Sequence, residues 1–224
     1  FTIEKYRYLL KFILSKNFAF KSYKCPKKNG QIYLRHDVDF SPEYALKIAL
    51  VESELDIKST YFFMLSSNTY NCLSKINKEI IEEIKFLGHD ISLHFDPSIY
   101  DDIHNGLQKE KTIFEDNFCK LVEIVSIHRP GNFLLDNNQK FQGCSHTYED
   151  KFFKELNYIS DSGGRDIISR IMNLDIKDVY QILIHPIWWI SQHDTPKKAL
   201  DEWIKFNNRF ITDEVRKNCK SYDN

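Results

Sequence analysis

The 224-residue sequence lacks the cysteine patterns that identify several classes of protein. It has five cysteines, and no two of them have the C-x-x-C spacing of a metal-binding or redox pair. An odd number of scattered cysteines argues against a disulfide framework and favours a reducing compartment. The sequence also shows no signal-peptide pattern, so we predict a cytoplasmic location.

A strong charge of one sign and a long apolar run are missing as well. Lysine and arginine number 31 against 32 aspartates and glutamates, which gives a formal net charge of −1. This balance argues against a nucleic-acid-binding protein that works through bulk positive charge. No apolar run approaches the roughly 20 residues that a membrane-spanning helix needs. We therefore expect no nucleic-acid partner and no membrane span.

The hydrophobic periodicity predicts an alternation of strands and helices. The expected helices cover residues 4–17, 42–55, 75–87, 101–118 and 195–217. The expected strands cover residues 31–36, 59–65, 89–95, 122–127, 158–160 and 180–184. This alternation predicts a parallel sheet or barrel with helices outside. No repeat or linker interrupts it, so we predict a single domain over residues 1–224.

Two other segments carry structural expectations. Residues 130–148 have no periodicity and are expected to form a long loop, which in a compact domain is often functional. The last helix is expected to pack inward through its apolar residues, namely Leu200, Trp203, Ile204, Phe206 and Phe210.

Polar side chains recur where the expected strands end. The groups are Arg35-His36-Asp37-Val38-Asp39, His94-Phe95-Asp96, His128-Arg129-Pro130-Gly131, Asp161-Ser162 and His185-Pro186. In parallel α/β barrels the carboxyl ends of the strands form the rim that carries active sites. Surface charge would scatter over both ends of the strands, so five such groups at one rim indicate a functional site.

The first of these groups has two interpretations. Asp37 and Asp39 are two residues apart, so an extended chain points them the same way. Neighbouring carboxylates repel each other unless a cation lies between them or one holds a proton, which favours a metal site or an acid/base pair. Alternatively, Asp39 or Ser41 caps a helix that has Pro42 in its first turn. The other strand ends favour the functional site.

Taken in order, short motifs at these strand ends resemble those of the polysaccharide deacetylase (NodB-homology) family, also described as carbohydrate esterase family four. The matching segments are Arg35 to Asp39, Gly88 to Asp96, Arg129 to Gly131, Tyr158 to Ser162, and Leu183 to Pro186. The resemblance covers residues 31–190 and implies a deformed (β/α)7-type barrel. It also implies metal-dependent hydrolysis of an N-acyl amide, with acetyl as the expected acyl group, on an amino sugar or glycan precursor.

The resemblance implies a role for each matching residue. Asp39 would bind a divalent metal, and Asp37 would be the general base for a water whose pKa that metal lowers. Arg129 would hold Asp37 through charge-assisted hydrogen bonds. His185 would be the general acid that protonates the leaving amine, and Asp161 would orient it.

The metal site departs from the family pattern at one position. His94 matches the first histidine ligand, but Ser98 stands where the family has a second histidine four residues later. Asp96 and His128 are equal candidates for the missing ligand, and His104 ranks behind them. Either set would suit zinc or a related divalent metal.

The substrate and the activity leave further alternatives open. Trp188 and Trp189 are candidates for stacking on sugar rings, and closing the core is an equally good interpretation. The expected substrate is an N-acylated amino sugar, free or linked to a nucleotide or lipid. One alternative is a protein that binds carbohydrate or a partner without catalysis, which the residue Ser98 favours. Another is a deacylase for a formyl group or a cyclic amide.

Overall fold

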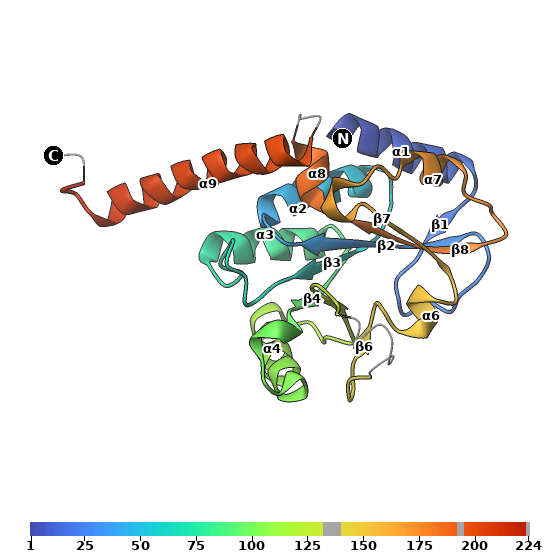
Figure 1. The fold of residues 1–224 in the computed structure, drawn as a ribbon, viewed down its shortest axis with the longest axis horizontal. Helices are drawn as coiled ribbons and strands as arrows, with labels where there is room; N and C mark the ends of the chain where they lie inside the picture. The colour runs from blue at the N-terminus through green and yellow to red at the C-terminus, as the bar shows by residue number, and fades with distance from the viewer. Residues whose placement is uncertain (132–139, 192–194, 223–224) are drawn as a thin grey trace.

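The computed structural model describes residues 1–131, 140–191 and 195–222. Its backbone forms a curled sheet of parallel strands whose outer side is covered by helices (Figure 1). The strands are β1 (Ala19–Phe20), β2 (Gln31–Val38), β3 (Thr60–Phe63), β4 (Asp90–Phe95), β5 (Ile124–Ile127), β6 (Ser145–His146), β7 (Asn157–Ser160) and β8 (Val179–Ile184). The helices are α1 (Ile3–Ser15), α2 (Pro42–Glu54), α3 (Lys75–Phe86), α4 (Ile103–Phe118), α6 (Asp150–Phe153), α7 (Ile168–Met172), α8 (Pro186–Ile190) and α9 (Pro196–Asn218).

The strand order confirms the predicted fold class. Along the sheet the strands follow the order β6-β5-β4-β3-β2-β8-β7, and β1 pairs with the start of β2. Every pairing between these strands is parallel. β6 and β7 stand at the two ends of this order, so within the described residues the barrel is open between them. This is a deformed barrel with parallel strands and helices outside.

The expected helices and strands are all present, and their ends differ from the predicted ones by at most two residues. The short elements β1, β6, α6, α7 and α8 have two to five residues, which is too few for a periodic pattern to show. The expected loop over residues 130–148 contains β6, and its residues 132–139 lie outside the described part of the chain. Among the described residues, no helix has both the length and the apolar character that a bilayer crossing requires.

The residues at the end of β2 include both the predicted helix cap and the two aspartates of the predicted site. The Oγ of Ser41 accepts a hydrogen bond from the backbone N–H of Tyr44 at 3.3 Å, so Ser41 caps α2 and Pro42 opens it. The two aspartates that precede this cap are therefore free to face the rim of the barrel.

Alternation along β2 separates two cores. The larger apolar core lies between the sheet and the helices and includes Leu34. A smaller aromatic cluster inside the curl consists of Tyr23, Tyr33, Phe62 and Phe152. Tyr33 is two residues before Arg35 on the same side of the strand. The aromatic cluster therefore closes the barrel interior beneath the polar end of β2.

A buried carboxylate joins α2 to the outer side of the sheet. The side chain of Glu52 is inaccessible to solvent and accepts hydrogen bonds from the hydroxyls of Tyr6, Ser59 and Tyr61 and from Nε2 of His36. Burial raises the pKa of Glu52, but His36 and the other partners outweigh burial and lower this pKa to about 2. His36 thus packs on the helix side and takes no part in the rim.

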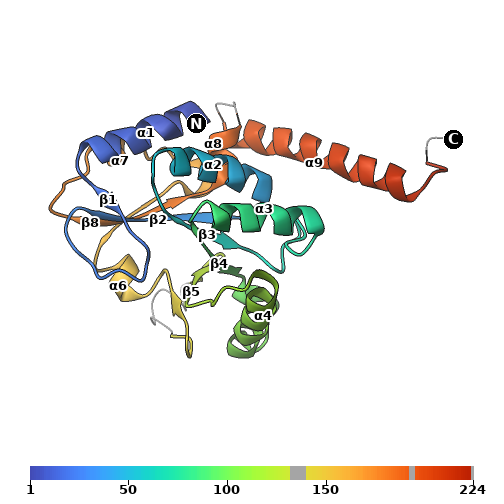
Figure 2. The ribbon, with the colours of Figure 1, turned by 180° about the vertical axis from the view of Figure 1, so that it is seen from behind.

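The helix α9 does not pack as predicted. It runs away from the body of the molecule (Figures 1 and 2), with Leu200 and Trp203 half-buried near its start. Ile204, Phe206 and Phe210 are exposed by 47%, 44% and 45%. The prediction that all five apolar residues point into the core is therefore wrong for these three. Their periodicity shows an apolar face but cannot show how far the body extends beneath it.

Candidate active site

Three side chains at the carboxyl ends of β2, β4 and β5 converge on one point. Nε2 of His94 lies 3.1 Å from Oδ1 of Asp39 and 3.1 Å from Nδ1 of His128. Nδ1 of His128 lies 3.6 Å from the same carboxylate oxygen. Among the described residues, Asp39, His94 and His128 form the group whose ligand atoms lie close enough together to hold a metal ion. In a tetrahedral zinc site with bonds of about 2.0–2.1 Å, neighbouring ligand atoms are about 3.3 Å apart, so the triangle fits such an ion.

The hydrogen bonds around this triangle also suit a metal. Oδ1 of Asp39 is buried and has no hydrogen-bond donor among the described residues. Nδ1 of His94 faces the carbonyl oxygen of Ser126 at 3.4 Å. A carbonyl can only accept, so Nδ1 donates to it, and in the neutral imidazole Nε2 has the lone pair that a cation would use. An oxygen without a donor beside a nitrogen lone pair is a site that a cation would complete.

Within the triangle of Asp39, His94 and His128, the carboxylate and the imidazoles stabilise each other's charged forms. Burial raises the pKa of Asp39, but the adjacent His128 and His94 outweigh it and hold this pKa well below its usual value. Burial lowers the pKa of His94, but Asp37 and Asp39 outweigh it and raise this pKa. The carboxylate of Asp39 is therefore ionised and able to bind a cation.

Asp37 lies beside the triangle and is held on one side. Its Oδ2 accepts hydrogen bonds from Nη2 of Arg35 at 3.2 Å and from Oγ of Ser126 at 2.8 Å. Nη2 of Arg35 also donates to the hydroxyl of Tyr148 at 2.8 Å, and the guanidinium lies over the Tyr148 ring. Oδ1 of Asp37 is buried and has no hydrogen-bond partner among the described residues. That oxygen is available to take a proton.

The cation beside Asp37 is Arg35 and not Arg129, which corrects the predicted contact. Arg35 is fully buried, whereas Arg129 is exposed with its backbone in the left-handed region at φ 46°. Residues two apart on a strand face the same way, so Arg35 reaches Asp37 directly. Arg129 lines the outer part of the pocket and makes no ion pair with Asp37 among the described residues.

Of the candidates for the missing ligand, the structure brings His128 to Asp39 and His94. The prediction of Asp96 as a ligand is not supported, because Oδ1 of Asp96 accepts hydrogen bonds from N and Oγ of Ser98 and caps a short 3-10 turn. His104 is exposed at the start of α4. The β4–β5 pairing aligns His94 with Ser126, which places His128 at the adjacent strand end.

A histidine and a carboxylate complete the opposite side of the pocket. Nδ1 of His185 lies 2.6 Å from Oδ1 of Asp161, and Nε2 of His185 lies 3.9 Å from Oδ2 of Asp39. Asp161 also accepts hydrogen bonds from the backbone N–H of His185 and from Nε1 of Trp189 at 2.8 Å. Burial lowers the pKa of His185, but Asp161 and the other carboxylates outweigh it and raise this pKa to about 9. The predicted pairing of Asp161 with His185 is present.

The two tryptophans after β8 are core residues, which corrects their prediction as substrate-binding residues. Trp189 is inaccessible to solvent, and its ring packs against Phe1 and Tyr6. Trp188 is 8% exposed. Both belong to the large apolar core, and neither lines the pocket. Both rings are buried in this core, so they have no face to offer a sugar.

These side chains line a cavity of about 440 Å³. Its walls contain Asp37, Asp39, His94, His128 and His185, so these five side chains open into one space. A cavity of this volume is in the range of small-molecule sites.

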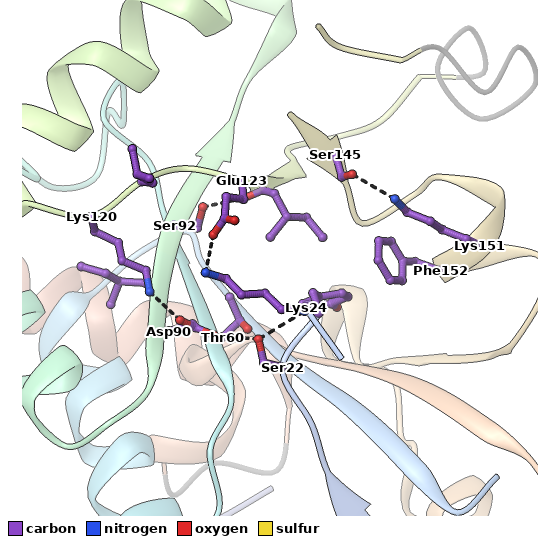
Figure 3. A pocket seen from close by; sticks show the side chains of 14 residues that line it. Ser22, Lys24, Thr60, Asp90, Ser92, Lys120, Glu123, Ser145, Lys151 and Phe152 are labelled. Atoms are coloured by element: carbon purple, nitrogen blue, oxygen red, sulfur yellow. Dashed lines mark hydrogen bonds and ion pairs between the residues drawn. The ribbon is translucent and has the colours of Figure 1, made fainter. Parts of the chain in front are cut away.

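A second cavity, of about 340 Å³, lies at the starts of β4 and β5, at the opposite end of the strands (Figure 3). Lys24 pairs with Glu123, and Lys120 pairs with Asp90 at 2.6 Å (Figure 3). Because these cations already have carboxylate partners, this cavity has no unpaired charge that would draw a ligand, and we do not consider it the candidate site.

Comparisons with known proteins bear on the fold. A scan against models of protein families and a search of curated proteins each found no match. Among solved structures, the peptidoglycan N-acetylglucosamine deacetylase Bc1960 is similar with a TM-score of 0.52 and 15% identity, over 89% of this chain and 90% of that one. A chitin deacetylase from the fungal pathogen Colletotrichum lindemuthianum has a TM-score of 0.49 and 14% identity, over 81% and 84%.

A CE4 family pseudoenzyme from Bacillus anthracis is also similar, with a TM-score of 0.46 and 16% identity. The match covers 83% of this chain and spans 62% of that one. At these identities the match to Bc1960 shows the fold alone. It confirms that the resemblance to carbohydrate deacetylases extends to the deformed barrel. The chain thus combines a deformed parallel barrel, a fold that it shares with Bc1960, with a candidate metal centre.

Three residues at the site were not identified from the sequence. They are Arg35, which donates to Asp37, Tyr148, whose hydroxyl accepts from Arg35, and Ser126, which contacts both Asp37 and His94. A signal existed for Arg35, since it lies two residues before Asp37 and so on the same side of β2. Ser126 and Tyr148 carry no signal of their own, because their positions depend on strand register and on the chain after β6.

Proposed function

We propose that this protein is a metal-dependent amide hydrolase that removes an N-acyl group, with acetyl as the expected group, from an amino sugar. The observation that carries the proposal is the triangle of Asp39, His94 and His128 beside the half-free carboxylate of Asp37. When bound there, a divalent metal such as zinc would polarise the amide carbonyl and acidify an attacking water. The fold shared with Bc1960 supports a carbohydrate substrate.

Asp37 is the proposed general base. Arg35 and Ser126 hold its Oδ2, so the free oxygen Oδ1 is the one that takes the proton from water. The guanidinium of Arg35 lies 3.2 Å from Oδ2 and supplies the counter-charge of the buried carboxylate. Both contacts come from within the barrel, so they fix the direction of the carboxylate before substrate enters.

His185 is the proposed general acid. Its Nδ1–H donates to Asp161, which leaves Nε2 on the pocket side as the atom that delivers a proton to the leaving amine. Asp161 is itself held by the indole N–H of Trp189 and by the backbone N–H of His185. This arrangement fixes the imidazole ring on the side of the pocket opposite His94 and His128.

The experiment combines metal analysis with acetate release from N-acetylated amino sugars. The purified protein should bind one divalent metal ion per chain and lose activity with a chelator. Asp39→Ala should lose both metal and turnover, whereas His185→Ala should keep the metal and lose turnover. Full turnover by either variant would exclude the proposed mechanism.

A second candidate function is carbohydrate binding without catalysis, which the serine at position 98 favours. The position of His128 supports catalysis instead, because it restores the third ligand of the triangle. A protein that binds metal and sugar but releases no acyl group from acetylated, formylated or cyclic amide substrates would support the second candidate.

A further inference from the structure

A buried acid on α4 plays no part in the mechanism proposed above. The buried face of this helix consists of Gly106, Leu107, Glu110, Lys111, Phe114 and Phe118. These residues recur every three or four positions, as on a helix face that packs on a core, where apolar side chains are expected. Glu110 stands in the middle of this face and is 3% exposed. Burial raises the pKa of Glu110, and the hydroxyls of Ser66 and Tyr100 partly offset this effect. An acid at such a position needs a reason other than packing.

One oxygen of Glu110 joins two segments of the chain. Oε1 accepts hydrogen bonds from Oγ of Ser66 at 2.6 Å and from the hydroxyl of Tyr100 at 2.8 Å. Ser66 follows β3, and Tyr100 lies between β4 and α4. Because β3 and β4 are parallel neighbours in the sheet, both segments leave the rim that carries the candidate site. A single carboxyl oxygen therefore fixes the two segments relative to α4.

Tyr100 transmits this contact to β4. Its ring stacks on that of Phe95, with centroids 5.7 Å apart and an angle of 15° between the planes. A Cβ atom at position 106 would lie 2.3 Å from Cγ of Tyr100, so Gly106 lets the backbone of α4 approach this ring closely. The ring of Tyr100 is thus held by α4 and in turn supports the side chain of Phe95.

Both histidines of the metal triangle depend on the position of Phe95. His94 precedes it in β4, and the carbonyl oxygen of Phe95 accepts a hydrogen bond from the backbone N–H of His128 at 2.7 Å. A displacement of Phe95 would therefore move both imidazoles, whose facing nitrogens are 3.1 Å apart. Metal–ligand distances have to match their preferred values to within about 0.2 Å, so such a displacement would weaken metal binding.

Ser66 connects Glu110 to the third residue of the triangle. Ser66 lines the candidate active-site pocket. In the same segment, Oγ1 of Thr69 donates a hydrogen bond to the carbonyl oxygen of Asp39. The segment is therefore bonded to Glu110 through Ser66 and to the end of β2 through Thr69. In this way Glu110 is linked to all three residues of the metal triangle.

We propose that Glu110 is a positioning residue of the candidate metal centre, and that it sets the distances between the three ligands through the hydroxyls of Tyr100 and Ser66. This inference rests on the proposed function in taking the triangle as a metal site. One carboxyl oxygen can accept both hydroxyls at once, which no apolar side chain can do. This requirement accounts for an acid on the core face of α4.

The test measures the affinity of the purified protein for Zn²⁺ by competition with a chelating indicator. Glu110→Met removes both hydrogen bonds but fills the space, and the affinity should fall about tenfold. Tyr100→Phe removes one hydroxyl of the same link and should also weaken binding. The double variant Glu110→Met/Tyr100→Phe should bind no more weakly than Glu110→Met, because the two residues act through one hydrogen bond. Glu110→Gln keeps an acceptor oxygen for both hydroxyls and should recover most of the affinity.

A loss of stability is the competing explanation, and Phe114→Leu is the control for it. Phe114 is fully buried on the same face of α4, one turn after Glu110, and has no group that bonds to either hydroxyl. Its truncation should lower the midpoint of urea unfolding and leave the affinity for Zn²⁺ unchanged. Tyr100 is half-buried, so Tyr100→Phe keeps the test valid if Glu110→Met does not fold.

A spectrum reports the arrangement of the ligands separately from the affinity. The visible absorption of Co²⁺ bound in place of Zn²⁺ depends on the number and geometry of its ligands. At full loading, the Co²⁺ spectrum of Glu110→Met should differ from that of the wild type. The spectra of Glu110→Gln and Phe114→Leu should match the wild type.

Three outcomes separate this inference from the proposed function. If Glu110→Met is folded and keeps the wild-type affinity and Co²⁺ spectrum, the positioning role is wrong and the proposed function is unaffected. If Phe114→Leu loses as much affinity as Glu110→Met, stability explains the loss and the positioning role is again wrong. If the expected losses of affinity appear but the wild type releases no acetate from N-acetylated amino sugars, the positioning role is supported and the proposed function is contradicted.

Discussion

Nδ1 of His128 lies 3.1 Å from Nε2 of His94, and the two histidines come from neighbouring strands rather than from one motif. The second nitrogen ligand of the candidate metal site is thus supplied by the end of β5. The position four residues after His94 is Ser98, whose N–H and hydroxyl donate to Oδ1 of Asp96 instead. The candidate site thus offers one oxygen and two nitrogen atoms to a metal although the chain lacks the expected second histidine.

His128→Ala should therefore lower metal affinity strongly. An outer hydrogen-bond partner of a metal ligand already contributes about 10–100-fold to affinity, so loss of a ligand should cost at least as much. Asp96→Asn, the matched control from the competing candidate, should stay within a few-fold of wild type. Competition with a chelating indicator measures both. Equal losses in the two variants would show that Asp96 also binds the ion.

Arg35→Met should destabilise the fold by about 3–5 kcal/mol, because it removes the guanidinium partner of the buried carboxylate of Asp37. Arg129→Met removes an exposed side chain and should change the free energy of unfolding by about 0.5 kcal/mol or less. Urea unfolding at neutral pH provides the comparison. In the double variant Arg35→Met/Asp37→Asn, part of the lost free energy of unfolding should be recovered, because the buried negative charge is no longer present. A large loss in Arg129→Met would restore the original assignment.

Local patterns predicted the strands and their polar ends because both follow from side-chain periodicity. Asp37 and Asp39 face the rim by the alternation of β2, and His185 lies beside Asp161 because β7 and β8 are neighbours in the sheet. The same alternation applied one step earlier identifies Arg35 as the partner of Asp37. The contact between Arg129 and Asp37 was predicted from the family motif and not from the geometry of this strand.

The remaining features depend on contacts between distant segments. The choice of His128 over Asp96 depends on the β4–β5 register and on the turn that Ser98 stabilises. The burial of Trp188 depends on how α8 packs against α1 and α2. For α9, the sequence predicted an apolar face but not the surface that this face contacts, because a periodic pattern carries no information about the neighbouring elements.

Trp189→Phe should weaken the support of Asp161 while keeping an aromatic ring in the core. The variant removes the indole N–H that donates to Oδ2 of Asp161 and leaves a buried carboxylate with one donor fewer, at a cost of about 1–3 kcal/mol. Trp188→Phe is the matched control, since Nε1 of Trp188 is buried without a hydrogen-bond partner among the described residues. Thermal unfolding compares the two stabilities, and an equal cost in both would show that ring volume alone matters.

The buried carboxylate of Glu52 should make stability fall on the acid side. Its pKa of about 2 in the folded protein lies below the value of about 4.3 expected in the unfolded chain. The unfolded state therefore binds the proton first, so the contribution of ionised Glu52 is complete above the unfolded pKa. That contribution is lost as pH falls toward 2. Glu52→Gln removes this dependence.

At pH 7, Glu52→Gln should be less stable than wild type, because a glutamine amide cannot accept all the hydrogen bonds from Tyr6, Tyr61 and Ser59. Between pH 7 and pH 3.5 the difference between wild type and variant should shrink by about 1 kcal/mol. Urea unfolding at the two pH values measures it, with the exposed Glu79→Gln as control. A difference that stays constant would mean that the carboxyl group of Glu52 ionises alike in the folded and unfolded chain.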